Sequence, residues 1–225
     1  MTHLAFDCIG FDLDGTLLET SGDLAEAVNH VIAPLGLEGF TAHSIRPFVG
    51  RGSHKMLERA LAARGRTDAD ELTERLLPEL TEFYAAHLAV HTRPFPGAVA
   101  ALEGLAALGL RLAVCTNKVE RLALPLIAQL GLTRHFATIV CGDTVGALKP
   151  DPAPLRAMME RAGAGRWLFV GDTSNDTGAA RAAGLPCVAL SFGFCDGNVR
   201  ALGADAVIDR YEQLVPLVQA WPAAR

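Results

Sequence analysis

The chain has 225 residues, half of them hydrophobic, and a formal net charge of −5 at pH 7. This length and apolar content exclude global disorder and allow folding without disulfides or a structural metal. The interspersed charges argue against nucleic acid or an anionic membrane as a partner. The N-terminus has no signal-peptide pattern and no run approaches a membrane span, which predicts a cytoplasmic protein.

The five cysteines are an odd number and include no C-x-x-C pair. Cys8, Cys115 and Cys187 lie in apolar runs that resemble strands. We therefore expect the cysteines to act as small hydrophobic residues rather than as disulfides or metal ligands.

An apolar run that begins at Leu4 predicts a buried strand, and it ends on Asp12 and Asp14. Side chains alternate in an extended segment, so both carboxylates are expected on one face at the strand's carboxyl end, where open α/β sheets bind ligands. Two anions this close require a cation, and Mg²⁺ suits them. Gly15 allows a sharp turn, and the Thr16 hydroxyl is expected to form a local hydrogen bond.

Residues 17–93 have helical periodicity and no strand candidate. A helical insert directly after the first strand, between Pro- or Gly-containing hinges, predicts an all-α lid or cap domain of residues 17–93. Pro78 predicts a bend or break in its last helix. The expected helices begin at Ser21 or Asp23 and end near Gly36, begin at Thr41 or Ser44 and end near Gly50, cover 53–64, and cover 72–88 behind a capping box of Thr67 and Asp70.

Strands and helices alternate from Pro94 onward, which is typical of a doubly wound parallel sheet. The catalytic core is therefore predicted to comprise residues 1–16 and 94–225. Its expected helices are 98–108, 119–130, 153–162 and 177–183, and its expected strands are 110–115, 136–140, 167–170, 186–190 and 206–208.

Polar residues follow three further strands of this predicted sheet. Thr116 and Asn117 start a helix, Lys149 precedes a proline, and Asp172 and Asp176 lie one helical turn apart. Each cluster alone has an ordinary explanation as a helix cap or a solvated loop. Together they place the matching residues along one sheet edge, and oxygen ligands without a His or Cys cluster favour Mg²⁺ over Zn²⁺.

The motifs D-x-D-G-T, T-N, K-P and G-D-x-x-x-D, in this order, resemble those of the haloacid dehalogenase superfamily, in the phosphatase branch with a helical cap after the first strand. The resemblance covers essentially the whole chain and implies a Rossmann-like core. It implies that Asp12 is the nucleophile that forms an aspartyl-phosphate, and that Asp14 protonates the leaving alkoxide and later activates water. Dehalogenase members lack the second Asp, so dehalogenation is disfavoured.

The same resemblance assigns the remaining site residues. It implies Mg²⁺ bound by Asp12, the Asp14 carbonyl and Asp172. Asp176 would be either a further direct ligand or a residue that contacts one of the ligands. Substrate contacts are implied for Gly15, for Thr116 and for the Asn117 amide, which would hold phosphoryl oxygens, and Lys149 would offset their charge.

The stretches V-G-R-G at 49–52, T-R-P-F-P-G at 92–97, T-N-K at 116–118 and S-F-G-F at 191–194 resemble bacterial phosphoglycolate phosphatases. This resemblance implies hydrolysis of 2-phosphoglycolate, a small phosphorylated metabolite, by a monomer or homodimer. A substrate carboxylate would need a cation, which Arg51 or Lys55 could supply.

Several other functions fit the same motifs. The alternatives are a sugar-phosphate phosphatase, a pyrophosphatase, a β-phosphoglucomutase-like mutase, or a non-catalytic regulatory protein on this fold. Six of the seven histidines show no ligand spacing and are assigned no role: His30, His43, His54, His87, His91 and His135.

Overall fold

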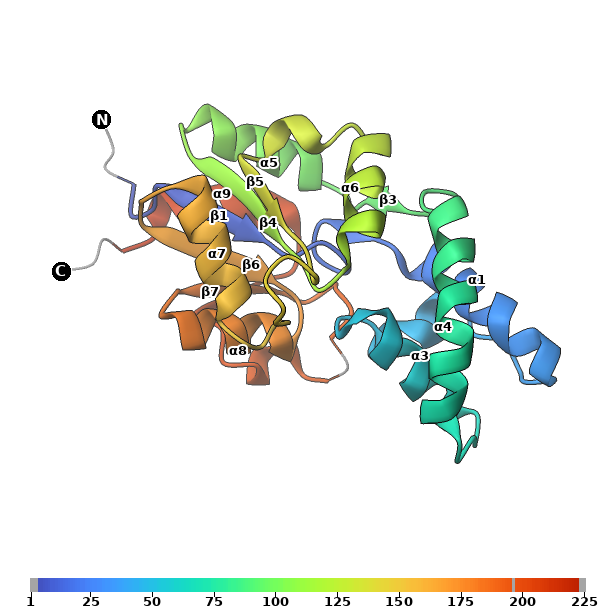
Figure 1. Cartoon of the computed structure of the whole chain (residues 1–225). Coiled ribbons are helices and arrows are strands. Elements are labelled where there is room, and N and C mark those ends of the chain that lie inside the picture. The colour runs from blue at the N-terminus through green and yellow to red at the C-terminus, as the bar shows by residue number, and fades with distance from the viewer. Residues whose placement is uncertain (1–3, 196, 223–225) are drawn as a thin grey trace.

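The computed structural model describes residues 4–195 and 197–222. Six parallel strands form one sheet in the order β5-β4-β1-β6-β7-β8 (Figure 1). The central strand β1 (Cys8–Phe11) pairs with β4 (Arg111–Cys115) on one side and with β6 (Trp167–Gly171) on the other. The outer strands are β5 (Thr138–Val140), β7 (Cys187–Leu190) and β8 (Ala206–Ile208). This arrangement confirms the predicted doubly wound α/β fold.

Helices cover both faces of the sheet, because both faces of its strands are apolar. On one face α7 (Ala153–Ala162) and α8 (Ser174–Ala183) bury Met158 and Ala179 with Cys8 and Phe169. The other face carries α5 (Ala98–Ala107), α6 (Glu120–Gln129) and α9 (Leu214–Ala220). The predicted cysteine burial is confirmed for Cys8, Cys115 and Cys187.

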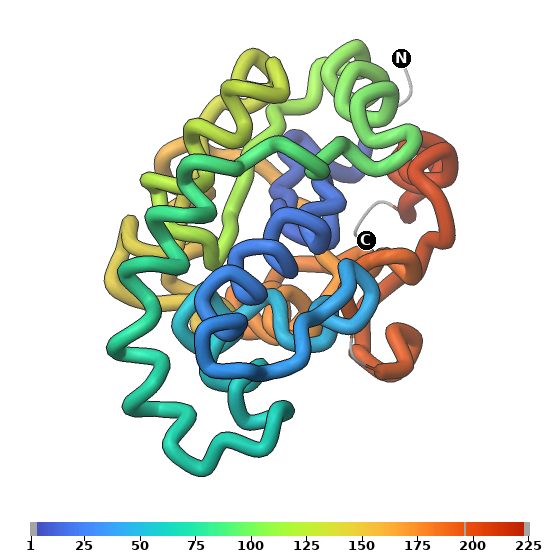
Figure 2. The backbone as a smooth tube through the Cα atoms, turned by 90° about the vertical axis from the view of Figure 1, so that its right-hand side faces the viewer, coloured from blue at the N-terminus to red at the C-terminus, as the bar shows by residue number. Residues whose placement is uncertain are grey.

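A helical segment stands beside the sheet between its first and second strands in the chain. It contains α1 (Ser21–Ile32), α2 (Ala42–Ile45), α3 (Gly52–Ala63) and α4 (Ala69–Ala86). Figure 2 looks at the molecule from the side of this segment, whose helices lie in front of the core. The prediction that residues 17–93 form a separate cap domain stays a prediction, as do the boundaries of the core. Residues 1–3 and 223–225 of the predicted core lie outside the described part.

The two connections of this segment form a short ribbon that the sequence did not indicate. β2 (Leu18–Glu19) pairs antiparallel with β3 (Arg93–Pro94). The expectation that residues 17–93 hold no strand was therefore wrong at both ends. Two residues per strand are too few for an alternating pattern, and only the pairing of segments distant in sequence defines them.

Two local expectations for α4 were also wrong. The predicted break at Pro78 is absent, because the missing N–H would have bonded the carbonyl of residue 74, a position on the exposed side of the helix, while a bend there stays a prediction. Thr67 and Asp70 do not cap it, because the N-cap is Asp68, whose carboxylate binds Arg66 instead. Likewise α1 begins after Thr20 without a side-chain cap, and Asp23 bonds elsewhere.

Some short elements escaped prediction. Helix α9 was missed because its seven residues include a proline and carry little periodicity. Short 3₁₀ turns complete the described part: η1 (Ala33–Leu35), η2 (Arg46–Phe48), η3 (Thr133–His135), η4 (Val199–Ala201) and η5 (Tyr211–Gln213).

Candidate active site

The carboxyl ends of the strands bring the predicted polar residues together. Asp12 follows β1, Thr116 follows β4, and Asp172 follows β6, while Lys149 comes from the loop after β5. All four are buried, with at most 5% of each residue exposed. From β1 the chain continues to β4 and β5 on one side of the sheet, and it later crosses back to β6, β7 and β8 on the other side. Such points, where the strand order reverses, are where α/β sheets bind ligands.

Three buried acids face one another at this edge. Asp12, Asp172 and Asp176 each offer a carboxylate oxygen, and these atoms all lie within 4.8 Å of one another. Burial raises the pKa of Asp12 to about 7, and burial together with the Asp176 and Asp12 charges raises the pKa of Asp172 well above its usual range. An all-oxygen set of buried anions is what a hard divalent cation such as Mg²⁺ requires.

Asp172 is held by two donors from distant segments. The Thr16 hydroxyl donates to Oδ1 at 2.7 Å and the Phe194 main-chain N–H to Oδ2 at 2.6 Å. The expectation of a local bond for Thr16 was therefore wrong. Gly15 turns the chain with a φ of 83°, and a Cβ there would collide with the Asp172 carboxylate, so only glycine brings Thr16 to this acid.

Lys149 joins two of the acids. Its Nζ lies 2.8 Å from Asp12 Oδ1 and 2.7 Å from Asp176 Oδ1, and it also donates to the Cys115 carbonyl. Burial alone would lower the pKa of Lys149, but Asp12 and Asp176 raise it above its ordinary value. The ammonium therefore stays charged beside Asp12.

Asn117 fixes the loop that carries this lysine. Its Oδ1 accepts from the Lys149 N–H at 2.8 Å, and its Nδ2 donates to the Lys149 carbonyl at 3.0 Å and to the Gly50 carbonyl at 2.9 Å. Asn175 Nδ2 also donates to Gly50, which lies in the helical segment. Both amides therefore tie that segment to the core, and a contact between Asn117 and a phosphoryl group stays a prediction.

Asp176 accepts hydrogen bonds from four donors of the protein. Its Oδ2 accepts from the main-chain N–H groups of Asp172 and Thr173 and from the Thr173 hydroxyl. Its Oδ1 accepts a hydrogen bond from Lys149 Nζ. This carboxylate thus caps α8 and positions Asp172 and Lys149.

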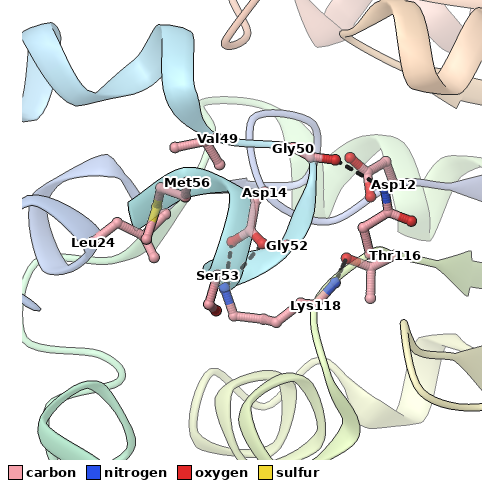
Figure 3. Close-up of a pocket in the computed structure, with 11 residues that line it drawn as sticks. Asp12, Asp14, Leu24, Val49, Gly50, Gly52, Ser53, Met56, Thr116 and Lys118 are labelled. Atoms are coloured by element: carbon pink, nitrogen blue, oxygen red, sulfur yellow. Dashed lines mark hydrogen bonds and ion pairs between the residues drawn. The ribbon is translucent and has the colours of Figure 1, made fainter. Parts of the chain in front are cut away.

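Asp14 is not part of the group of three acids and binds a lysine to which the sequence assigned no role. Lys118 Nζ lies 2.8 Å and 2.9 Å from the two Asp14 carboxylate oxygens (Figure 3). Burial alone would lower the pKa of Lys118, but Asp14 raises it above the ordinary value. The T-N-K triplet was the signal that could have identified it, because Lys118 follows two residues already placed at the site.

A small cavity opens beside these groups, between the core and the helical segment. Figure 3 shows Asp12 and Asp14 on its core side and Leu24, Val49 and Met56 on the opposite side. Arg51 does not line it but lines an adjoining cavity with Leu148. Lys55 lies on the outer side of α3, where its Nζ is 2.6 Å from Glu58. Neither cation reaches the cavity here, and their contacts with substrate stay predictions.

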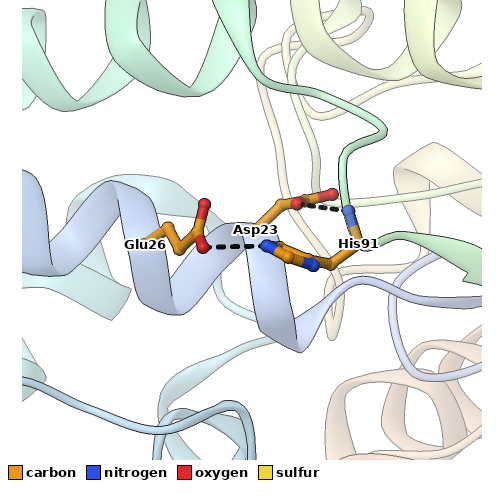
Figure 4. A group of neighbouring side chains, drawn as sticks. All are labelled: Asp23, Glu26 and His91. Carbon is orange, nitrogen blue, oxygen red and sulfur yellow. Dashed lines mark hydrogen bonds and ion pairs between the residues drawn. The ribbon is translucent and has the colours of Figure 1, made fainter.

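A second group with potential metal ligands lies where the helical segment returns to the core. Figure 4 shows Glu26 bonded to the His91 ring, and Asp23 bonded to the His91 main chain. Asp23 also accepts from the N–H and the hydroxyl of Thr92. These donors engage both Asp23 oxygens, so Asp23 fixes the hinge.

Comparison with known proteins defines the class. The family model described as haloacid dehalogenase-like hydrolase matches residues 9–190. The chain belongs to this family, and it is an enzyme, a phosphatase of the haloacid dehalogenase type. Within the described residues, none of the helices has the length and apolar character needed to cross a bilayer.

Particular relatives refine this comparison. The phosphoglycolate phosphatase of Agrobacterium fabrum is 42% identical over 92% of this chain and 89% of its own length. A structure described as a predicted phosphoglycolate phosphatase from Haemophilus somnus is 27% identical, with a TM-score of 0.83, over 94% of this chain and 97% of that one. The CbbY protein of Rhodobacter sphaeroides, solved with xylulose 1,5-bisphosphate, is 25% identical with a TM-score of 0.76, over 93% and 96%.

Proposed function

We propose that this phosphatase hydrolyses 2-phosphoglycolate to glycolate and phosphate through an aspartyl-phosphate. An Asp12 carboxylate oxygen attacks phosphorus, and the bond from phosphorus to the glycolate oxygen breaks. Asp14 gives its proton to that oxygen, then takes a proton from the water that attacks the phospho-aspartate. This second attack releases phosphate and restores the Asp12 carboxylate.

The other residues position and neutralise these groups. Lys149 contacts Asp12 directly and would offset charge on the phosphoryl oxygens. Asp12, Asp172 and the Asp14 carbonyl are proposed to hold Mg²⁺, with Asp176 either as a further ligand or as the group that positions Asp172. When bound, the ion would supply positive charge beside the phosphoryl group. The segment of residues 17–93 is proposed to act as a cap that limits water access.

One observation carries the proposal most directly. Asp12 and Asp14 line the same small cavity from one turn, yet they have different partners, Lys149 and Lys118. Two carboxylates in different environments can serve as nucleophile and as acid or base. The phosphoglycolate phosphatase relatives at about 40% identity support the choice of substrate.

The decisive variant is Asp12→Asn, because an amide cannot form the phospho-enzyme. We expect phosphate release from 2-phosphoglycolate with Mg²⁺ to fall by at least about 10³-fold, while the thermal midpoint stays within a few degrees. Release is measured as inorganic phosphate, with Arg134→Met, an exposed residue far from the cavity, as control. Activity of wild-type magnitude in Asp12→Asn would exclude this mechanism.

A second candidate is a phosphatase for a small sugar phosphate. The CbbY complex with a sugar bisphosphate and the second cavity that adjoins the site support it. A panel of 2-phosphoglycolate, sugar phosphates and pyrophosphate, compared by kcat/KM, separates the candidates. Conversion between hexose phosphates without phosphate release would indicate a mutase instead.

A further inference from the structure

The cavity beside Asp12 has a single positive charge among the described residues that line it. That charge is Lys118, whose side chain is only 4% exposed. The wall opposite the carboxylates is apolar, with Leu24, Val49 and Met56. If a small substrate carries a second negative group besides the phosphate, Lys118 is therefore the residue of this cavity that can neutralise it.

Lys118 is a buried positive charge that can attract a further anion. An ammonium has three N–H donors, and the two Asp14 oxygens account for two of them. Among the described residues, the Tyr84 side chain is the other group that interacts with this ammonium. A buried ammonium attracts any additional anion strongly, because little water competes for it.

Tyr84 adds a second donor beside this ammonium. The ring of this fully buried residue of α4 has its centroid 4.8 Å from Lys118 Nζ. Its hydroxyl lies near enough to help raise the pKa of Lys118, yet it is buried without a regular hydrogen-bond partner among the described residues. Burial raises the pKa of Tyr84 to about 12, so the group is a neutral hydroxyl that can donate. The Tyr84 O–H group has no acceptor of regular geometry among the described residues, and a bound acceptor would supply one.

We infer that Lys118, supported by the Tyr84 side chain beside it, binds the carboxylate of the substrate and sets the preference for carboxylate-bearing phosphomonoesters. The inference rests on the proposed function and deepens it. Thr116 and Lys118 come from one loop, and two residues span at most about 7 Å of chain. Phosphoryl-binding and carboxylate-binding groups are thus close together, as a two-carbon acid requires.

The test compares two substrates that differ only in the charged end. These are 2-phosphoglycolate and 2-hydroxyethyl phosphate, in which CH₂OH replaces the carboxylate. For Lys118→Met, the ratio of their kcat/KM values is expected to fall by about 100-fold, mainly because the substrate with the carboxylate acquires a higher KM. Any effect of the substitution on Asp14 acts on both substrates and cancels in the ratio. An unchanged ratio would overturn the inference.

Further variants keep the test decisive. Tyr84→Phe removes only the hydroxyl and is expected to lower the same ratio by about tenfold, while Arg134→Met, at an exposed cation, leaves it unchanged. If Lys118→Met does not fold, the test uses two other variants. Lys118→Arg keeps the charge and is expected to retain the preference for the carboxylate substrate. Tyr84→Phe is expected to weaken that preference, and an unchanged preference in Tyr84→Phe would then overturn the inference.

Failure of the inference and failure of the proposed function have different signatures. Wild-type enzyme that hydrolyses neither compound with Mg²⁺ would contradict the proposed function. Wild-type enzyme that hydrolyses 2-phosphoglycolate, with equal losses on both compounds in Lys118→Met, would contradict only carboxylate recognition. Binding of 2-phosphoglycolate to Asp12→Asn with and without Lys118→Met, measured by calorimetry, gives a readout independent of turnover, and we expect about 100-fold weaker binding in the double variant.

Discussion

Thr16 shows how a single hydroxyl supports the proposed metal site. It is completely buried and donates to Asp172, and its own carbonyl accepts from the Tyr211 hydroxyl at 2.8 Å. Thr16 thus links the first motif to the strand that delivers Asp172. Groups that orient a ligand in this way tune metal affinity without touching the metal.

Thr16→Val is expected to weaken Mg²⁺ binding by about tenfold, because the Asp172 carboxylate loses its orienting donor. The measurement is the Mg²⁺ concentration that gives half-maximal activity. The matched control is Thr20→Val, four residues later, where the buried hydroxyl has no partner in the described part of the chain. That variant should keep wild-type metal affinity, and identical Mg²⁺ dependence in both variants would refute the role given to Thr16.

At the scale of elements, the hinge between the helical segment and the core depends on α1 and the strand β3. Asp23 in the first turn of α1 accepts from His91 N at 2.8 Å, Thr92 N at 2.9 Å and Thr92 Oγ1 at 2.6 Å. Because this carboxylate is only 1% exposed, its bonds compete little with water. They hold the returning chain in register with the outgoing one.

Asp23→Asn is expected to lower the free energy of unfolding by about 2–3 kcal/mol, because the new NH₂ group faces a main-chain donor in place of an acceptor. Urea denaturation measures the change. Glu26→Gln on the same helix alters only the exposed pair with His91 and should change the value by less than about 0.5 kcal/mol. Equal changes in the free energy of unfolding for the two substitutions would show that the buried Asp23 bonds contribute no more to stability than the exposed pair.

For the whole molecule, the buried acids predict how stability depends on pH and metal. The raised pKa values of Asp12, about 7, and of Asp172 mean that the metal-free folded state binds more protons than the unfolded chain above pH 4. Its free energy of unfolding should therefore fall as pH rises from about 4 to about 7, by about 1.4 kcal/mol per pH unit for each extra bound proton. Mg²⁺ should reverse the loss.

Thermal unfolding in EDTA at pH 5 and at pH 7.5, with and without excess Mg²⁺, measures this linkage. We expect a lower midpoint at pH 7.5 without metal, a larger increase from Mg²⁺ at that pH, and a shallower dependence in Asp12→Asn. A metal-free protein that is more stable at pH 7.5 than at pH 5 would contradict the account.

Several features could be predicted from residues alone because they follow from local pattern and topology. The apolar run before Asp12, and those before Thr116 and Asp172, predicted strands, and parallel strands place their carboxyl ends on one edge. The sequence alone was therefore enough to predict that these residues converge at one edge of the sheet. The helices were placed similarly by their periodicity, although their ends and caps were less accurate because tertiary partners such as Arg66 compete for the capping side chains.

The sequence by itself determined the fold class, the helical insertion and the set of acids, because periodicity and motif order are local properties of the chain. Only the tertiary structure decided which side chains pair. Lys118 and Asp14 are 104 residues apart, and Thr16 and Asp172 are 156 apart. Such pairs depend on the directions of side chains after the sheet and the helical segment have packed, and no spacing within one segment encodes that direction.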